Sequence, residues 1–457
     1  DLVRSRGLGD VYKRQVAVSA EDTNALVVDS SSVTLAGNIQ QAVAVSNNVV
    51  NELLLSGTNS GVDGEQGVTS SLASWQEHTG STVPVSATSS LSLSGPAQLT
   101  DSTLGITDNA SVAMAVLNEA SNMAEIDFTN LGSSSSGGAT QATLNASNPV
   151  YGTADHLVSN IQLVPAGGDT TLSSSAILEA LNQESGGGAF ANGVDASNIG
   201  IVGNVAQAQS VANLASSTLN LTASGNMAAT GGVFNNQEND QVTVRATAQG
   251  TLGVALDTTG TAVTTMNASS ARIEDNRVSA TAVSNQASNI LNVTADAGYQ
   301  NLSANGASAS GANASNVQAT ATYAVLNNQT NGALVEASVN GSSANADFTG
   351  NTGSATVSGS STSVSGNRFA ANATGNSATN LMTASARPAG NASMALASSQ
   401  VNTGSISATA NSVNVGVNTG GVGAGIQGST SRVSGNTISA NATGNAVSSR
   451  ISNNSRF

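Results

Sequence analysis

The sequence predicts an all-β fold, a parallel β-solenoid of stacked strand–arc–strand coils with loop insertions in the first half. Three observations predict it: a composition poor in large apolar and charged side chains, an Asn/Ala pattern that recurs along the chain, and a change of strand parity inside each copy of that pattern. A recurring pattern of this kind is typical of coils that bury one continuous interior by stacking on one another.

The composition limits both the core and the chemistry. Of the 457 residues, 9% are charged, 2% are aromatic and 39% are hydrophobic, and there is no Cys. Disulfides and thiolate metal sites are therefore excluded. The formal net charge of −15 makes the chain a poor ligand for nucleic acid. Coils stacked about 4.8 Å apart favour neutral residues, because like charges at that spacing repel. We expect an interior of Ala and Val with no room for Phe.

Residues 1–15 differ from the remainder. They hold four of the twelve Lys and Arg residues, and the chain after them has eight Arg and no Lys. The string from Ser5 to Gln15 resembles a translated sequencing adapter, so we interpret residues 1–15 as an artefactual N-terminal scar that leaves the true N-terminus and any signal peptide out of sight. No apolar run approaches the about 20 residues of a membrane-spanning helix, and we expect no transmembrane segment.

One pattern recurs through the chain: Asn, Ala four and six residues later, Asn at nine, an apolar residue at eleven and Asn at thirteen. Clean copies begin at Asn38, Asn109, Asn276 and Asn367, worn copies at Asn204, Asn226 and Asn436, and poorer copies at Gln318 and Asn402. Stacked Asn side chains can form hydrogen bonds along a ladder. The predicted ladder residues are Asn38, Asn47, Asn51, Asn109, Asn118, Asn122, Asn276, Asn285, Asn289, Asn367, Asn376, Asn380, Asn436 and Asn445.

The spacing predicts a bend inside each copy. Offsets zero, four and six share one parity, and offsets nine, eleven and thirteen share the other, so a straight strand would point the two sets to opposite faces. A turn between offsets six and nine points both sets into one interior. Offset seven is β-branched in every copy, as in Val45 and Thr374, and the next residue is often small, as in Gly375. Gly or Asp precedes the first Asn, as in Gly37 and Asp108, which is turn chemistry.

Several of the distances between copies fit a coil of roughly 20–25 residues, with one to four coils between neighbouring copies. The last two distances, 35 and 34 residues, fit badly, so the predicted period is loose. We divide the chain into the scar at 1–15, N-terminal β-coils at 16–56, an irregular β-solenoid with insertions at 57–197, and regular β-solenoid repeats at 198–457. The irregular part contains stretches without clean copies of the pattern, which we interpret as loops, elaborated coils or a small side region.

Few residues are candidates for chemistry. His78 follows Glu77 and His156 follows Asp155, but neighbours on a strand point to opposite faces, so neither pair is an obvious dyad. We expect both His in exposed loops. Residues 63–65, Asp-Gly-Glu, resemble the start of a calcium loop without the remainder of its pattern. Phosphate-binding loops, GxSxG and HExxH motifs are absent. We expect a protein that is not an enzyme and has no cofactor and no metal.

Residues 371–378, ANATGNSA, resemble the second half of the curlin repeat, in which Gln-x-Gly-x-Gly-Asn-x-Ala recurs. Gly375, Asn376 and Ala378 match that repeat, Ala replaces its Gln and first Gly, and residues 440–447 match it through their Gly and Asn. The long Asn/Ala/Val chain is also similar to holdfast anchor proteins, secreted relatives of the curli system that tie adhesive polysaccharide to a bacterial envelope. The resemblance implies an extracellular or outer-membrane-surface location, a curli-type secretion pore for export, and as partner an envelope polysaccharide or the protein itself as a polymer.

The sequence thus predicts a secreted structural or adhesive surface protein, a scaffold or fibre. One alternative is an adhesin passenger or phage-tail-type fibre, although the residues before Phe457 lack the alternating apolar strand of a barrel. A polysaccharide-degrading β-helix is a second alternative, with few aromatic residues to build its cleft. Ice binding is a third, although Thr does not recur in paired rows.

Overall fold

The structure is a computed structural model. It describes residues 2–5, 14–20, 28–61, 67–78, 85–93, 98–133, 140–142, 151–165, 171–180, 193–255, 265–298, 309–312, 318–347, 356–387, 392–418 and 426–454.

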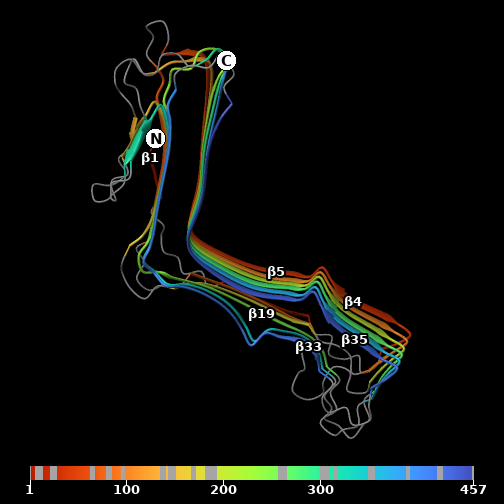
Figure 1. The fold of residues 1–457 in the computed structure, drawn as a ribbon. Coiled ribbons are helices and arrows are strands. Elements are labelled where there is room, and N and C mark those ends of the chain that lie inside the picture. The colour runs from red at the N-terminus through yellow and green to blue at the C-terminus, as the bar shows by residue number, and fades with distance from the viewer. Residues whose placement is uncertain are drawn as a thin grey trace.

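The described residues form a parallel β-solenoid, and no helix occurs among them. The chain winds through six coils, and equivalent strands of successive coils pair in parallel. Viewed nearly along the stack, each coil has an L-shaped outline with two layers in each arm (Figure 1). The predicted fold class is therefore confirmed.

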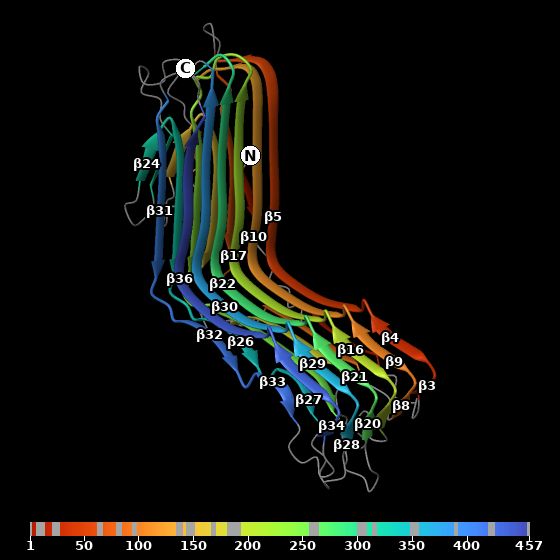
Figure 2. The same cartoon turned by 45° about the vertical axis from the view of Figure 1, so that its right-hand side comes forward.

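Long strands line the inside of the bend and run through both arms (Figure 2). We call them the bent sheet. Its strands are β5 (Ile39–Ser60), β10 (Ala110–Leu131), β17 (Val205–Ala223), β22 (Arg277–Ala295), β30 (Arg368–Ala386) and β36 (Thr437–Asn453). Val116 of β10 pairs with Val45 and Val211, and Asn118 pairs with Asn47 and Asn213, but the residue between them, Leu117, has no pairing partner in the register. The pairing is interrupted at the same place on every strand of the sheet.

The inward parity changes at this interruption, as the repeat spacing predicts. On β10, Ala113 and Ala115 are buried before it, whereas Asn118, Ala120 and Asn122 are buried after it. Both sets face the space between the two layers. The bend therefore lies between offsets six and nine of the pattern.

Two return sheets form the opposite layers. The first return sheet faces the second half of the bent strands and contains β1 (Leu2–Ser5), β6 (Ser70–Glu77), β13 (His156–Val164), β18 (Gly231–Asn239), β25 (Tyr323–Asn331) and β31 (Met394–Asn402). The second faces their first half and contains β2 (Arg14–Ala20), β7 (Val85–Leu93), β14 (Thr171–Ala180), β19 (Thr243–Ala255), β26 (Val335–Asn340), β27 (Ser343–Asp347), β32 (Ile406–Asn411) and β33 (Asn414–Asn418).

Two narrow sheets complete each coil at the far end of the second arm. The short-strand sheet contains β4 (Ser32–Ala36), β9 (Thr103–Thr107), β16 (Asn198–Val202), β21 (Ser270–Glu274), β29 (Ser361–Ser365) and β35 (Thr430–Ser434). The tip sheet contains β3 (Val28–Asp29), β8 (Gln98–Thr100), β15 (Gly193–Asp195), β20 (Thr265–Asn267), β28 (Thr356–Ser358) and β34 (Ile426–Gln427). We number the coils 1 to 6 by these tip strands.

The turn from the short-strand sheet into the bent sheet needs a left-handed residue. The residues at this turn, with φ between 56° and 71°, are Gly37, Asp108, Gly203, Asp275, Gly366 and Gly435. Asp never occupies two successive coils here. A Cβ added at Gly203 would lie 2.5 Å from Oδ1 of Asp108, because the carboxylate of one coil uses the space above the Gly of the next.

The expected coil length is wrong. Along the first Asn of the pattern, successive coils are 71, 95, 72, 91 and 69 residues apart. The copies beginning at Asn226 and Gln318 place their β-branched residues on β18 and β25, in the opposite layer of coils that already contain a clean or worn copy. The copy at Asn402 likewise falls on a return strand, β32. The Asn/Ala pattern occurs on both layers of a coil, so counting its copies divides one long coil into several short ones.

Two insertions explain the longest coils, and only one lies in the first half of the chain. They contain β11 (Thr140–Ala142) and β12 (Tyr151–Ala154) in coil 2, and β23 (Ala309–Ala312) and β24 (Gln318–Ala321) in coil 4. These four strands form an antiparallel side sheet in which β12 pairs with β23. The described strands of 57–197 otherwise belong to the same sheets as those of 198–457.

The core is built mainly from Ala, Val, Leu and Ile, but it also accepts large side chains. Phe234, Tyr323 and Phe369 are fully buried, so the expectation of an interior without room for Phe is wrong. Wide coils of two-layered arms leave local space that a narrow coil lacks. Within residues 1–15, residues 2–5 form β1 on the first return sheet, and β2 begins at Arg14 on the second.

Candidate functional site

The first Asn ladder runs through all six coils at the start of the bent sheet. It consists of Asn38, Asn109, Asn204, Asn276, Asn367 and Asn436. Each Nδ2 donates to Oδ1 of the next coil over 2.8–2.9 Å. The backbone N–H of each Asn donates to the same Oδ1 over 2.9–3.2 Å. From the second coil onward, Nδ2 also donates to a backbone carbonyl of the preceding coil.

The second Asn ladder follows the bend. It consists of Asn47, Asn118, Asn213, Asn285, Asn376 and Asn445, and its Nδ2–Oδ1 distances are 2.7–2.8 Å. In coil 4, Nδ2 of Asn285 also donates to the carbonyl of Thr330 on the first return sheet over 2.8 Å. In coil 5, Asn376 makes the same bond to Val401. This ladder therefore joins successive coils and also joins the two layers.

The third ladder is interrupted by Ser. Its members are Asn51, Asn122, Ser217, Asn289, Asn380 and Ser449. Asn51 donates to Asn122 over 2.9 Å, and Asn289 donates to Asn380 over 2.9 Å. Ser217 lies between these two pairs, so the row of Asn–Asn hydrogen bonds is interrupted at coil 3. Each of the predicted ladder residues thus lies in one of these three ladders, whereas the copy starts Asn226 and Asn402 do not.

A Gln ladder on the first return sheet was missed. It consists of Gln76, Gln162, Gln237, Gln329 and Gln400, in which each Nε2 donates to Oε1 of the preceding coil over 2.6–2.8 Å. Each Nε2 also donates to a carbonyl of the bent sheet across the interior. The signal that could have found it is Asn or Ser two residues before each Gln, repeated five times along the chain.

A Ser ladder at the tip turn was also missed. It consists of Ser31, Ser102, Ser197, Ser269, Ser360 and Ser429, in which each backbone N–H donates to Oγ of the next coil over 3.0–3.1 Å. Each of these Ser residues precedes an Asn of the first ladder by seven positions, as Ser31 precedes Asn38. That constant distance was the available signal.

The two His residues are not in exposed loops, contrary to expectation. His156 opens β13 and is fully buried, with Nδ1 2.8 Å from Oγ of Ser70. Burial lowers its pKa to about 4, although the neighbouring charge of Asp155 acts in the opposite direction. Asp155 accepts hydrogen bonds from the backbone and hydroxyl of Thr230 at 2.8 and 3.0 Å. His156 and Asp155 therefore have separate partners.

His78 directly follows β6 and lies beside β5 near its bend. It is partly buried, its Nδ1 is 3.4 Å from Oγ of Ser46, and burial lowers its pKa. Its backbone N–H donates to the carbonyl of Leu163 on the next coil. Glu77, the last residue of β6, pairs with Leu163 in the sheet. Residues 63–65 lie outside the described residues, and the calcium-loop resemblance lies there with them.

One carboxyl group has a strongly shifted pKa. Burial, together with a side-chain hydrogen bond and the charge of Asp240, raises the pKa of Glu238 to about 7. The pair lies at the end of β18, where the chain turns toward the second return sheet. Among the described residues, no three His, Asp or Glu side chains are grouped so as to hold a metal ion. Nor do these residues include a helix long and apolar enough to cross a membrane.

The face inside the bend carries outward rows of neutral polar side chains. One row, on the second half of the bent strands, contains Ser121, Ser216, Ser288, Thr379 and Ser448 on coils 2 to 6. In a neighbouring row, Asn292 donates to Asn220 over 3.0 Å. Both arms of this face belong to the same long strands (Figures 1 and 2), so the rows run parallel along one continuous bent surface.

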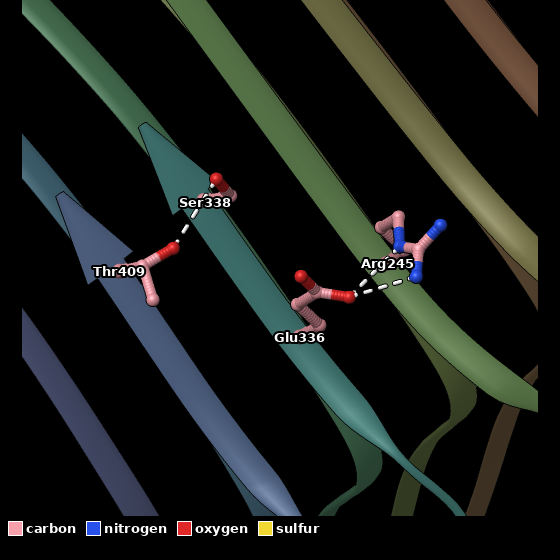
Figure 3. Close-up of polar contacts among 4 residues, drawn as sticks. All are labelled: Arg245, Glu336, Ser338 and Thr409. Atoms are coloured by element: carbon pink, nitrogen blue, oxygen red, sulfur yellow. Dashed lines mark hydrogen bonds and ion pairs between the residues drawn. The ribbon is translucent and has the colours of Figure 1, made fainter. Parts of the chain in front are cut away.

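The outward face of the second return sheet is less uniform. Arg245 forms an ion pair with Glu336 of the next coil, with Nε and Nη2 each 2.9 Å from Oε2 (Figure 3). Beside it, the Thr409 hydroxyl donates to Ser338 over 3.3 Å. An exposed pair of this kind contributes little to stability, but it shows that opposite charges on successive coils meet directly.

The comparisons with known proteins give no family: no protein-family model, no curated protein and no solved structure matches this chain.

Proposed function

We propose that this chain is a secreted structural or adhesive surface protein, a rigid scaffold that binds polysaccharide along the face inside its bend. The observation that supports this most directly is the continuity of the first and second Asn ladders through all six coils. Neighbouring coils in such a stack need each other, so the function depends on the repeated layer and not on a single cluster of catalytic side chains.

In this proposal the scaffold acts by being rigid, and its rigidity comes from hydrogen bonds between coils and between layers. Each coil adds side-chain hydrogen bonds to its backbone pairing, and each neutral bond contributes about 0.5–1.5 kcal/mol. The Gln ladder and the second Asn ladder also join the bent sheet to the first return sheet, which resists sliding of these two layers past one another. A stack held in both directions transmits force along its axis without a hinge.

The outward rows favour a neutral polysaccharide. Coils are about 4.8 Å apart, so a glycan chain lying along the stack meets a similar hydroxyl or amide at each coil. The hydroxyl row continues through Ser216, Ser288 and Thr379 in coils 3 to 5. In coil 2 the same face carries Glu119, Glu125 and Asp127, which repel acidic glycans. We therefore propose that coils 3 to 6 form the binding surface.

The location is proposed as extracellular or on the outer-membrane surface, with export through a curli-type secretion pore, on the resemblance to curlin and holdfast anchor proteins. In this proposal the protein is not an enzyme and needs no cofactor. An adhesin passenger or a tail-type fibre would use the same rod in a different assembly. Hydrolysis of acidic glycans by the purified chain would favour a polysaccharide-degrading enzyme instead.

The test is co-sedimentation of the purified chain with insoluble cellulose and chitin, both neutral, and binding to immobilised alginate, which is acidic. We expect binding to a neutral polysaccharide and weaker binding to alginate. The variant S216E/S288E/T379E should weaken the neutral interaction at least about tenfold, because three hydroxyl contacts are replaced by charges. Circular dichroism establishes that the variant keeps its β-structure.

The matched control is S175E/T247E/T409E, which adds the same charges to one outward row of the second return sheet. It should bind as the unmodified chain does. His78→Gln should also leave binding intact. If the control weakens binding as much as the inner-face variant does, or if the unmodified chain binds none of the three polysaccharides, the proposal is wrong. Loss of binding by folded His78→Gln would point to a discrete site.

A further inference from the structure

Among the described residues, the bent sheet has two open edges. β5 is its outermost strand at one end and β36 is its outermost strand at the other, while β1 and β2 belong to the return sheets. A long strand with an unpaired edge presents a row of backbone donors and acceptors to any strand that matches it. β5 has 22 residues and β36 has 17, so both edges are unusually long.

The interior side chains are exposed at the β36 end. The apolar residues Val433, Ile438, Val447 and Ile451 are 47–53% exposed. Their counterparts in coil 5 are Val364, Phe369, Ala378 and Met382, which are at most 4% exposed. The apolar interior thus continues to the last described coil and is uncovered there. Three of the corresponding positions in coil 1 are also apolar: Leu35, Val49 and Leu53.

The second Asn ladder has a direction, and its two ends match. Every Nδ2 donates toward the next coil, so the ladder begins with an acceptor at Asn47 and ends with a donor at Asn445. Oδ1 of Asn47 is buried and accepts no hydrogen bond from the described residues. Nδ2 of Asn445 reaches only a carbonyl of Gln400, 3.3 Å away at the surface. A donor above Asn47 would complete the ladder.

The charges are separated along the axis. Residues 16–244 contain no Lys or Arg, and residues 348–457 contain no Asp or Glu. The charged residues of coils 1 and 2 are therefore Asp and Glu, while Arg4 and Arg14 lie on β1 and β2, which pair with the return strands of coil 1. Coils 5 and 6 carry Arg as their only charged residue type. On the face inside the bend, one row makes the contrast local. Across coils 1 to 6 this row contains Glu52, Met123, Thr218, Ile290, Leu381 and Arg450.

We propose that the partner at β36 is a second copy of this chain, whose β5 adds to the bent sheet in the same register. Asn445 then donates to Asn47 of the next copy, and Arg450 lies one strand away from Glu52 of the next copy. Val447 and Ile451 cover Val49 and Leu53. The contact joins two different surfaces and does not close, so it propagates as a filament. This inference deepens the proposed function by naming the partner of the scaffold.

The charge separation selects this arrangement. Joining two β5 ends or two β36 ends would place like charges on neighbouring strands, whereas the head-to-tail contact places Arg450 beside Glu52. Both side chains are exposed, so salt weakens their attraction. Assembly should therefore become less favourable as the salt concentration rises, while the ladder and apolar contacts remain.

The experiment uses sedimentation velocity of the full chain over a range of protein concentrations at low salt. The unmodified chain should form head-to-tail oligomers whose length increases with protein concentration. Glu52→Arg and Arg450→Glu should each raise the concentration needed for assembly roughly tenfold, because attraction becomes repulsion. The double variant E52R/R450E should assemble as the unmodified chain does. The two single variants, mixed, should co-assemble, because each then meets its opposite charge.

Glu125→Arg is the matched control. It makes the same charge change on the same face, within the stack on β10, and should leave assembly unchanged. The inference is overturned if the unmodified chain stays monomeric at every concentration. It is also overturned if neither the double variant nor the mixture regains assembly, or if the control weakens assembly as much as the single variants do. Lateral association, seen as side-by-side particles in negative-stain images, would also overturn it. Polysaccharide co-sedimentation of the single variants reports separately on the proposed function, because it needs one copy only.

Discussion

Nδ2 of Asn285 donates a hydrogen bond to Oδ1 of Asn376 on the next coil over 2.8 Å, and both side chains are fully buried. An amide carries a donor and an acceptor on one uncharged group. It can therefore be repeated from coil to coil, each copy serving as acceptor on one side and donor on the other. A carboxylate accepts but does not donate, so it can occupy a single layer but cannot be repeated.

Replacing both members of this pair by Asp should unfold the middle of the stack. Asn376→Asp alone loses the donations to Asn445 and Val401, while its oxygen still accepts from Asn285. In the double variant with Asn285→Asp, two buried carboxylates face each other, and we expect a loss of about 3–5 kcal/mol in the free energy of unfolding. Urea denaturation followed by circular dichroism measures it. Asn372→Asp, on the outward face of β30, should change stability by no more than about 0.5 kcal/mol.

Enlarging an inward Ala should cost stability. Ala373 is 1% exposed between the layers, and Ala373→Leu should destabilise the fold by about 1–3 kcal/mol or more through overpacking. Its neighbour Asn372 faces outward, where it accepts a hydrogen bond from Asn441 over 3.0 Å. Asn372→Leu should have the smaller effect on the melting temperature. The reverse order would contradict the assignment of the two faces.

Placing a third Asp in the left-handed turn row should be unfavourable even though Asp tolerates that backbone. Gly203→Asp would bring a Cβ to 2.5 Å from Oδ1 of Asp108 and would set three carboxylates on successive coils, the third being Asp275. We expect a loss of about 1–3 kcal/mol by thermal denaturation. Gly435→Asp in the last described coil, beside Gly366, provides a control with no Asp on the neighbouring coil. An equal loss in both variants would mean that the contact with Asp108 is unimportant.

The free energy of unfolding should decrease as the pH falls from 6.5 toward 4, because His156 is buried in its neutral form. Its pKa is about 4 in the folded chain and 6.5 when unfolded, so the unfolded state binds the proton more tightly. The stabilisation is fully present above pH 6.5 and is lost as the pH falls toward 4, up to about 3 kcal/mol. Urea titrations at several pH values should show this slope in the unmodified chain and a shallower one in His156→Gln.

Glu238 should give the opposite pH dependence, with stability that decreases as the pH rises. Its pKa is about 7 in the folded chain, raised from 4.5 mainly by burial. The folded state therefore keeps the proton longer, and its contribution is present below pH 4.5 and lost as the pH rises through 7. Glu238→Gln should flatten the decline in melting temperature between pH 5 and 8. If the decline in melting temperature is unchanged in this variant, another group causes it.

Deleting residues 1–15 should leave the folded stack intact. The deletion removes β1 and the first two residues of β2, which lie at one end of the two return sheets. None of the five ladders contains a residue from this segment. We expect the melting temperature to fall by no more than a few degrees, whereas a loss of cooperative unfolding would show that the segment belongs to the fold.

The sequence predicted the local geometry of the bent sheet better than its long-range order. The parity change at Val45 and its equivalents is encoded within fourteen residues, so it could be derived from spacing alone. The coil length could not, because Val233 and Val325 on the return strands repeat the signal of the bent strands. Insertions of different length then hide the regular return of each ladder, as the 95 and 91 residues between successive Asn show.

The His residues show the same limit. Adjacency in sequence correctly separates His156 from Asp155, but it says nothing about burial, which depends on Ser70 in the preceding coil and on Thr230 in the following one. Such partners are 86 and 75 residues away from their contacts. They become predictable only once the coil length is known.

The side sheet has a consequence for how the molecule yields under force. In an ordinary stack the outermost coil can peel away alone. Here β12 from coil 2 is paired with β23 from coil 4, so coil 3 is bracketed by a strap that crosses over it. A molecule pulled from its two ends would release its outer coils in small successive extensions, and coils 2 to 4 would then break together in one larger extension at higher load.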